Sequence, residues 1–303
     1  VTVKDARATA LGRTAVQQSS NVSSSAFDKA AGTILVNDIT IRNTTDADDS
    51  YSTSANSGSA IAKANAINDA SEFTGVTARV LATRVDGERG ADSPADITAG
   101  TLNEQSFIKI NGEIITGFAV TNDDSNGELV AQINAFTDKT GVVARLDKNY
   151  RLTLEAVDGR NIHVETSDGA AEAITGLKED VYTGRIELES DSAFFVTSNV
   201  GGAGDDGFGA LGFNNAQVVA VNSAKSSVSQ VDTLSRESSN RAIQVIDRAL
   251  EQISANRADL GALHNRLEST INNLSSISEN IAASRGRILD ADFAAESATM
   301  AKT

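Results

Sequence analysis

One column of aliphatic residues near the end of the chain limits its fold more than any other feature. Every seventh residue in this column is leucine or isoleucine: Ile246, Ile253, Leu260, Leu267, Leu274, Ile281 and Ile288. Between Ser238 and Arg285 there is no proline and a single glycine, Gly261. This spacing predicts one helix of about 48 residues, roughly 70 Å long at 1.5 Å per residue.

The predicted helix needs a packing partner. A second column, three residues earlier in each heptad, mixes apolar and polar residues: Ile243, Leu250, Arg257, His264, Ile271, Ser278 and Arg285. The polar members favour a bundle of several helices over a two-stranded zipper. A helix of this length is not stable alone in water. Residues 1–240 contain no second long helical pattern, so the partner must be a helical segment outside this sequence or other copies of the chain.

Composition excludes several classes of function. The 303 residues carry a formal net charge of −15, which argues against binding nucleic acids or anionic membranes. No run of about 18 apolar residues could cross a bilayer. The absence of cysteine removes disulfides and thiolate chemistry.

The segment from about residue 27 to 213 has the pattern of β-hairpins, with short β-branched runs broken by Asn-Gly and Asp-Gly pairs. FIKINGEII (107–115) predicts a hairpin whose turn is Asn111-Gly112, with positive φ at both residues. The spacing of Ser125 and Glu128 predicts a capping box that starts a short helix. Three further strands follow, so residues 105 to 167 are expected to form a ββαβββ unit.

A weaker copy of this unit lies upstream. INDASEFTGVTARV (67–80) aligns without a gap with INAFTDKTGVVARL (133–146), and VNDITI (36–41) aligns with INGEII (110–115). The first copy has an insertion between hairpin and helix, rich in Ser, Asp and Asn, which is expected to be a solvated, mobile loop. The predicted fold class is α+β: an elongated β-rich outer region of two ββαβββ-like modules, about 27–100 and 105–178, plus a long C-terminal helix of a helical-bundle core.

The C-terminal residues resemble a known family. RADLGALHNRLESTINNL (257–274) and ENIAASRGRILDADFAAESATMAK (279–302) resemble the C-terminal core of bacterial flagellins. DARATALG (5–12) resembles the point where a flagellin chain leaves its N-terminal helical core. The 105–167 unit is similar to the flagellin IN module, named for the Ile-Asn pairs seen here at Ile110-Asn111 and Ile133-Asn134.

The resemblance implies a structural subunit, not an enzyme, that self-assembles into the extracellular flagellar filament after type III export. It implies as partners other flagellin subunits, the N-terminal core helix of the same protein, the export chaperone, the filament cap protein and a host Toll-like receptor. It also divides the chain into an exit segment (1–19), the outer domain (20–215), the core helix (216–290) and the start of the inner-tube helix (291–303). The sequence is then expected to be a fragment, without the N-terminal core and the end of the last helix.

The residues expected at the subunit interface and in core packing are Ile246, Leu250, Ile253, Arg257, Leu260, Gly261, His264, Asn265, Arg266, Leu267, Ile271, Leu274, Ile281, Arg285 and Ile288. No catalytic, cofactor or metal site is expected. His163 and His264 have no spacing relation, and neither lies in the H-E-x-x-H pattern of a zinc protease. Two alternatives remain: the related hook–filament junction protein, and an adhesin or binding module whose β-repeats recognise a glycan or receptor while the helix is a stalk.

Overall fold

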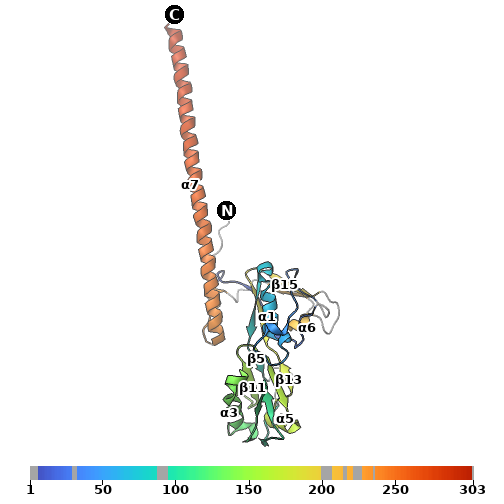
Figure 1. Cartoon of the computed structure of the whole chain (residues 1–303). Helices are drawn as coiled ribbons and strands as arrows, with labels where there is room; N and C mark the ends of the chain where they lie inside the picture. The colour runs from blue at the N-terminus through green and yellow to red at the C-terminus, as the bar shows by residue number, and fades with distance from the viewer. Residues whose placement is uncertain are drawn as a thin grey trace. The chain divides into compact units, whose positions relative to one another are not determined.

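A computed structural model describes residues 6–28, 33–86, 95–198, 207–213, 217–220, 227–234 and 236–301. The chain divides into two compact units, one of Val1–Gly12 with Ser227–Thr303 and one of Arg13–Ser226. The first holds a long helix and the second holds several small antiparallel sheets (Figure 1). The predicted α+β class with a long C-terminal helix is therefore confirmed. Among the described residues, no helix is apolar enough over a sufficient length to cross a membrane.

The β-rich unit extends beyond the expected range of 20–215. Its first strand starts before residue 20 and its last strand lies after residue 215, and each is the edge strand of a sheet. Its strands are β1 (Ala15–Asn21), β2 (Ile34–Val36), β3 (Ile39–Thr40), β4 (Val76–Leu81), β5 (Thr83–Val85), β6 (Gly100–Leu102), β7 (Ile108–Ile110), β8 (Glu113–Ile115), β9 (Phe118–Val120), β10 (Val143–Leu146), β11 (Leu152–Ala156), β12 (Ile162–Thr166), β13 (Asp180–Tyr182), β14 (Arg185–Ser190), β15 (Phe194–Ser198) and β16 (Gln217–Ala220). Its helices are α1 (Ala60–Asn68), α2 (Ser71–Thr74), α3 (Glu128–Ala135), α4 (Thr137–Thr140), α5 (Gly169–Thr175) and α6 (Gly207–Leu211).

These strands surround two hydrophobic cores. The sheets β1-β14-β4 and β16-β15-β2-β3 enclose one core, whose residues come from before Arg79 and after Arg185. The sheets β10-β11-β5, β13-β12-β7-β8 and β6-β9 enclose the other, built from residues 85 to 182. The first core is therefore not a contiguous stretch such as 27–100. Strand β4 needs β14 as a partner, with Ala78 opposite Leu188, and the whole second core lies between these two strands in the sequence.

Asn111 fixes the hairpin of the second core as the sequence predicted. Asn111 and Gly112 both have positive φ, 49° and 89°, as a two-residue turn requires. The Asn111 side chain donates to the carbonyl oxygen of Thr140 at 2.8 Å and accepts from the backbone N–H of His163 at 2.8 Å. The hairpin is thus tied to the end of α4 and to strand β12.

In the first core, the Asn37 side chain likewise ties the hairpin to a helix end and to the neighbouring strand. Its φ is 50°, its side chain donates to the carbonyl oxygen of Thr74 at 2.7 Å, and it accepts from the backbone N–H of Phe195 at 3.1 Å. Each core also has a pair of hydrogen bonds between the side-chain amide of a helix asparagine and the backbone of a strand alanine. The residues are Asn68 and Ala78 in the first core, and Asn134 and Ala144 in the second.

The predicted capping box at Ser125 and Glu128 does not form. Helix α3 begins after Gly127, whose left-handed backbone offers no side-chain cap. The first-turn N–H groups of Leu129 and Val130 donate instead to the two carboxylate oxygens of Asp124, at 2.9 and 3.0 Å. A charged acceptor at a helix N-terminus replaces the neutral one that was expected.

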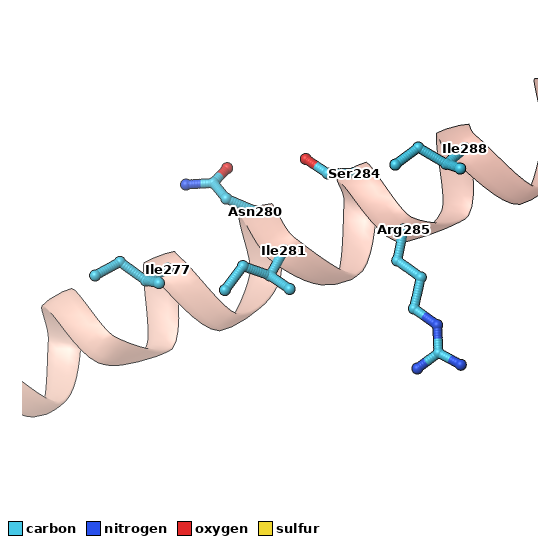
Figure 2. Close-up of a pocket in the computed structure, with 6 residues that line it drawn as sticks. All are labelled: Ile277, Asn280, Ile281, Ser284, Arg285 and Ile288. Carbon is cyan, nitrogen blue, oxygen red and sulfur yellow. The ribbon is translucent and has the colours of Figure 1, made fainter.

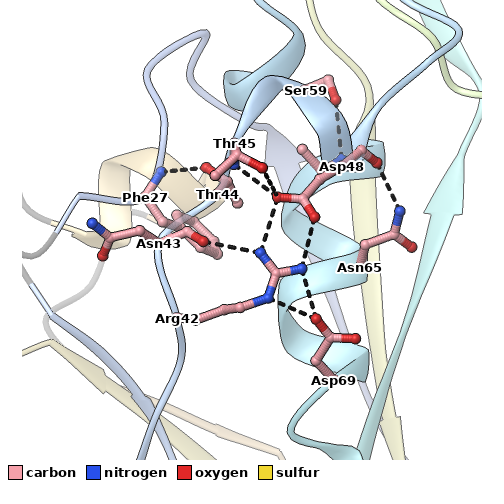
Figure 3. Close-up of polar contacts among 10 residues, drawn as sticks. Phe27, Arg42, Asn43, Thr44, Thr45, Asp48, Ser59, Asn65 and Asp69 are labelled. Atoms are coloured by element: carbon pink, nitrogen blue, oxygen red, sulfur yellow. Dashed lines mark hydrogen bonds and ion pairs between the residues drawn. The ribbon is translucent and has the colours of Figure 1, made fainter.

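The polar insertion of the first core is ordered, contrary to the expected mobile loop. It forms two short 3-10 helices, η1 (Asp46–Asp48) and η2 (Asn56–Gly58). Arg42 binds both carboxylate oxygens of Asp48, at 2.7 and 2.9 Å, and donates from Nε to Asp69 at 2.6 Å (Figure 3). The Arg42 guanidinium holds the pKa of Asp48 well below its usual range. The charged network gives the segment a fixed shape without a large apolar core.

In the other unit, α7 (Arg236–Met300) is a single helix of 65 residues. It is longer than the 48 residues expected, and it continues through residue 291, where the core helix was expected to give way to a second helix. It also begins later than residue 216, because residues 217 to 220 form strand β16. At 1.5 Å per residue α7 is roughly 100 Å long.

Candidate subunit interface

The predicted aliphatic column lies along α7 and is open to solvent. Exposed fractions are 45% for Ile246, 48% for Leu260, 53% for Leu267, 59% for Leu274 and 63% for Ile281. Ile253 is half-buried, and Ile288 is 70% exposed. Side chains of this kind are normally buried in a folded protein. Exposed apolar rows of this length are often contact surfaces between proteins, so the column is the candidate interface among the described residues.

The column ends in a shallow hollow on the same helix. The hollow is lined by Ile277, Asn280, Ile281, Ser284, Arg285 and Ile288. Figure 2 shows that all of these side chains project from one stretch of α7. A single helix cannot enclose a cavity, so this is an open apolar surface that would be completed by another element, and not a ligand pocket.

A different face of α7 is buried at its start. Ala242, Val245 and Ala249 are each 6% exposed or less. They follow the helical spacing i, i+3, i+7 and lie beside the aliphatic column, not in it. The sequence contains this A-x-x-V-x-x-x-A spacing. It was not identified as a packing face because the leucine and isoleucine column is longer and more apolar.

Residues 6–12 lie against this buried face. The backbone N–H of Gly12 donates to Oε1 of Gln252 at 2.9 Å, and the N–H of Val228 donates to the carbonyl oxygen of Leu11 at 3.1 Å. Gly12 has φ of +73°, and a Cβ there would lie 2.8 Å from Val245. Glycine is therefore required at this approach. The segment covers one face of the helix start and leaves Ile243, Ile246 and Leu250 exposed.

The remaining predicted interface residues are also exposed on α7, but they do not share one face. Around the helix at 100° per residue, Arg257 and His264 lie about 40 to 60° from the aliphatic column on one flank, whereas Arg266 lies about 100° from it on the other flank. The exposed members are Leu250, Arg257, Gly261, His264, Asn265, Arg266, Ile271 and Arg285. If all of them contact other chains, neighbours must approach α7 from more than one direction.

Two glycines of α7 have no role in the described fold. A Cβ built at Gly261 or at Gly286 would meet nothing within 4 Å. Glycine inside a helix costs about 1 kcal/mol relative to alanine. Glycines in such positions allow the backbone of another element to approach closely.

The described residues provide no metal centre, since no group of three His, Cys, Asp or Glu side chains is placed to hold an ion. His163 lies on β12, where its Nδ1 is 3.6 Å from Glu165, and His264 is exposed on α7. Sequence reasoning did not identify Lys63, a fully buried lysine that donates to the carbonyl oxygens of Ser23 and Ala210.

Comparisons with known proteins match both parts of the chain. A family model described as "Bacterial flagellin C-terminal helical region" matches residues 243–303, and one described as "Flagellin hook IN motif" matches residues 108–158. The helix with the exposed column and the hairpin of the second core are the regions matched.

Three relatives illustrate the extent of the similarity. "B-type flagellin" of Pseudomonas aeruginosa is 34% identical over 230 residues, covering 68% of this chain and 44% of the relative. "Flagellin A" of Helicobacter pylori is 31% identical over 310 aligned positions, covering 88% and 56%. "Flagellin A" of Vibrio cholerae is 35% identical over 172 residues, covering 55% and 41%. The chain spans about half the length of the curated relatives it matches.

Proposed function

This chain belongs to the bacterial flagellin family, and we propose that it is a structural subunit that self-assembles into the extracellular filament of the bacterial flagellum for motility. The observation that carries the proposal is the exposed aliphatic column of α7. Burying its seven side chains against other helices would contribute on the order of 10 kcal/mol per subunit before ordering costs. The described residues of a single chain leave the column exposed, whereas a polymer could bury it at every subunit.

Two kinds of helix would cover the column: the N-terminal core helix of the same protein and α7-type helices of neighbouring subunits. Gly261 and Gly286 support close approach of such helices, and Arg266, on the other flank of the column from His264, supports contacts in more than one direction. The export chaperone, the filament cap protein and a host Toll-like receptor belong to the same proposal as partners of the family. The receptor would meet α7 near Asn265 to Leu274.

The β-rich unit is proposed to be the outer domain, built from two copies of one ββαβββ-like module. The matching hydrogen bonds of Asn37 and Asn111 support the duplication. The proposed roles of the other segments are the exit segment for residues 1–19, whose last residues form the start of β1, the core helix for the first part of α7 and the start of the inner-tube helix for residues 291–303.

The alternatives are not favoured. A hook–filament junction protein would share the helical core, but the relatives compared above are flagellins. An adhesin with a helical stalk would leave the aliphatic column without a use. The similarity to flagellins supports a structural role and not an enzymatic one.

Leu267→Asp in the full-length protein tests the proposal. The substitution places a carboxylate in the middle of the column, where burial costs several kcal/mol in every subunit. We expect no filaments by electron microscopy, although the protein is still made and exported. Because Leu267 is 53% exposed in the structure, the same substitution in this 303-residue chain should change its melting temperature little while it is unassembled.

Ser269→Asp is the matched control, since it adds the same charge about 200° further around the helix. Filaments should form with this variant. If Leu267→Asp also gives normal filaments, α7 does not assemble through its aliphatic column and the proposed function loses its support.

A further inference from the structure

The chain passes between the two hydrophobic cores of the β-rich unit at only two places. It leaves the first core at the end of β4 and enters the second at β5, with Ala82 between the two strands. It returns from β13 to β14 through Thr183 and Gly184. Short covalent links of this kind can act as a hinge, and compact parts joined only in this way normally move relative to one another.

A further contact between the cores comes from the polar insertion of the first core. Ser52 Oγ accepts from the backbone N–H of Asn161 at 2.9 Å. The Asn161 side chain donates from Nδ2 to the carbonyl oxygens of Ser54 at 3.0 Å and Ala55 at 3.1 Å. Asn161 lies directly before β12 of the second core and is fully buried. These three hydrogen bonds join residues at least 106 positions apart in the sequence, so they are separate from the covalent links.

The part of the insertion that makes this contact, residues 49–56, is here named the junction segment, and the first core fixes its shape. Oδ1 of the buried Asp49 accepts from the backbone N–H groups of Tyr51 and Ser52 at 2.8 and 3.1 Å, and Oδ2 accepts from Ser52 Oγ at 2.6 Å. The Asn56 side chain donates to the carbonyl oxygens of Asp49 and Ser52 at 2.8 and 2.7 Å. Because the junction segment is already ordered, its contact with the second core costs little further conformational entropy.

The turn between β11 and β12, which carries Asn161, also packs on the end of β4. Gly159 in this turn is buried and has φ of +79°. A Cβ at Gly159 would overlap Val80 and lie 3.1 Å from the carbonyl oxygen of Leu81. A Cβ at Gly184, in the second covalent link, would lie 3.2 Å from the carbonyl oxygen of Gly159. Glycine permits this close approach, so the turn contacts the first core through both β4 and the junction segment.

An aromatic contact lies at the edge of the same junction. Arg160 of the second core lies over the ring of Tyr51 in the junction segment, with Cζ 5.8 Å from the ring centroid. Arg160 Nε donates to the carboxylate of Asp158 at 2.7 Å, which holds the guanidinium in place. Tyr51 is 59% exposed, so this cation–π contact adds modestly to the three hydrogen bonds.

The second core forms its own hairpin and helix with a shorter connection. There are 25 residues between Ile41 and Ile67 in the first core, against 17 between the aligned Ile115 and Ile133 in the second. The shorter connection contains the 3-10 helix η4 (Asn122–Asp124) and leads directly into α3. A hairpin and helix of this kind therefore do not need the extra residues, and contact with the other core accounts for them.

We propose that the junction segment locks the two cores into one rigid body, so that the β-rich unit does not bend at its two covalent links. Separating the cores would break three hydrogen bonds of a fully buried asparagine at once. Each bond is weak alone, but all three are made by one ordered segment and one turn, so they are lost or kept together. The lock acts within a single chain and does not require filament assembly.

Spin-label distance measurements on the 303-residue chain test the proposal. The chain has no cysteine, so Glu72→Cys in the first core and Glu104→Cys in the second, both at exposed positions, can carry the two labels. Double electron–electron resonance, with excess unlabelled protein to suppress distances between chains, should give one narrow distribution. Glu104→Cys with Lys148→Cys, both in the second core, is the control pair and should give a distribution of similar width.

Ser52→Ala combined with Asn161→Ala removes all three hydrogen bonds. This double variant should broaden the distribution between the cores at least about twofold and leave the control pair unchanged, because only the hinge is released. Thr53→Ala, next to Ser52 at an exposed position, is the matched control and should change neither distribution.

Each outcome decides the proposal. A broad distribution between the cores of the unsubstituted chain would overturn it, and so would a narrow one that the double variant leaves unchanged. If the double variant also broadens the control pair, the second core itself is disturbed, and Ser52→Ala alone decides because it leaves the sequence of that core intact. Broadening by this single substitution supports the lock, and an unchanged width overturns it. None of these results bears on whether the chain forms filaments, so the proposed function stands or fails separately.

Discussion

Asn111 and Thr140, 29 residues apart, are joined by a hydrogen bond from the Asn111 side chain to the Thr140 carbonyl oxygen at 2.8 Å. Asn111 is 7% exposed and has a φ of 49°. Asparagine tolerates this left-handed backbone better than most residues, and here its amide also satisfies two backbone groups, the carbonyl of Thr140 and the N–H of His163. One residue therefore sets the turn, the end of α4 and the position of β12.

Asn111→Ala should lower the free energy of unfolding of the β-rich unit by about 2 to 4 kcal/mol. It removes one buried and one partly buried hydrogen bond, leaves their backbone partners unsatisfied, and places alanine at positive φ. Urea unfolding followed by circular dichroism measures the change. The exposed Asn149→Ala is the control and should differ by less than about 0.5 kcal/mol. If Asn111→Ala also lowers the free energy of unfolding by less than about 0.5 kcal/mol, the hairpin does not depend on the Asn111 side chain.

Local signals were sufficient for parts of this fold. The Asn111-Gly112 turn was predictable because a two-residue hairpin requires positive φ at both positions, and few residue pairs permit it. The length of the aliphatic column made the helix predictable in the same way. The N-terminal cap of α3 was not predictable. The Ser125–Glu128 spacing assigns the cap to Ser125, whereas the carboxylate of Asp124 accepts the hydrogen bond from the first turn.

The non-local parts were not predictable from spacing. Ala78 pairs with Leu188, and the second core lies between them in the sequence, so no tandem alignment could recover the first core. The exposed column on α7 was predicted as an interface from its pattern alone.

Helix α7 should be unevenly stable in the unassembled chain. Its start is covered through Ala242, Val245 and Ala249, whereas almost every described side chain after Arg257 is exposed. A helix without packing is marginal in water. Amide hydrogen exchange should therefore be slow from about residue 242 to 252 and fast beyond about residue 260, and protection should extend along α7 on assembly. Uniform slow exchange along the unassembled helix would show that α7 does not need a partner.

The Arg42–Asp48 pair makes the first core sensitive to acid. The pKa of Asp48 is lowered in the folded state, mainly by its hydrogen bond to Arg42, so this stabilisation is present above the ordinary value of 3.8 and is lost as pH falls below it. Because the Arg42 side chain is 40% exposed, Asp48→Asn should cost only about 1 kcal/mol at pH 7. Asp69→Asn, at a carboxylate that is 60% exposed, is the control and should cost less. If the two substitutions lower the free energy of unfolding equally, Asp48 is not the main partner of Arg42.

Lys63 should make the stability of the β-rich unit rise with pH. Burial lowers its pKa from the ordinary value of 10.5 to about 7. Between these values the unfolded chain binds more protons than the folded one, so the free energy of unfolding increases by up to about 1.4 kcal/mol per pH unit. The neutral amine keeps two N–H groups, enough for the carbonyl oxygens of Ser23 and Ala210.

Lys63→Met removes the titrating group and should flatten this rise. We expect the slope of unfolding free energy between pH 7 and 9, measured by urea midpoints, to fall by about 1 kcal/mol per pH unit relative to the unsubstituted protein. The methionine side chain would leave two carbonyl oxygens without a donor, so the variant should also be less stable at pH 9, where the native amine is neutral. Lys148→Met, at an exposed position, controls for the loss of a lysine charge and should keep the original slope. If Lys63→Met and Lys148→Met give the same slope, Lys63 stays protonated in the folded protein and the two carbonyl oxygens hold it as a cation.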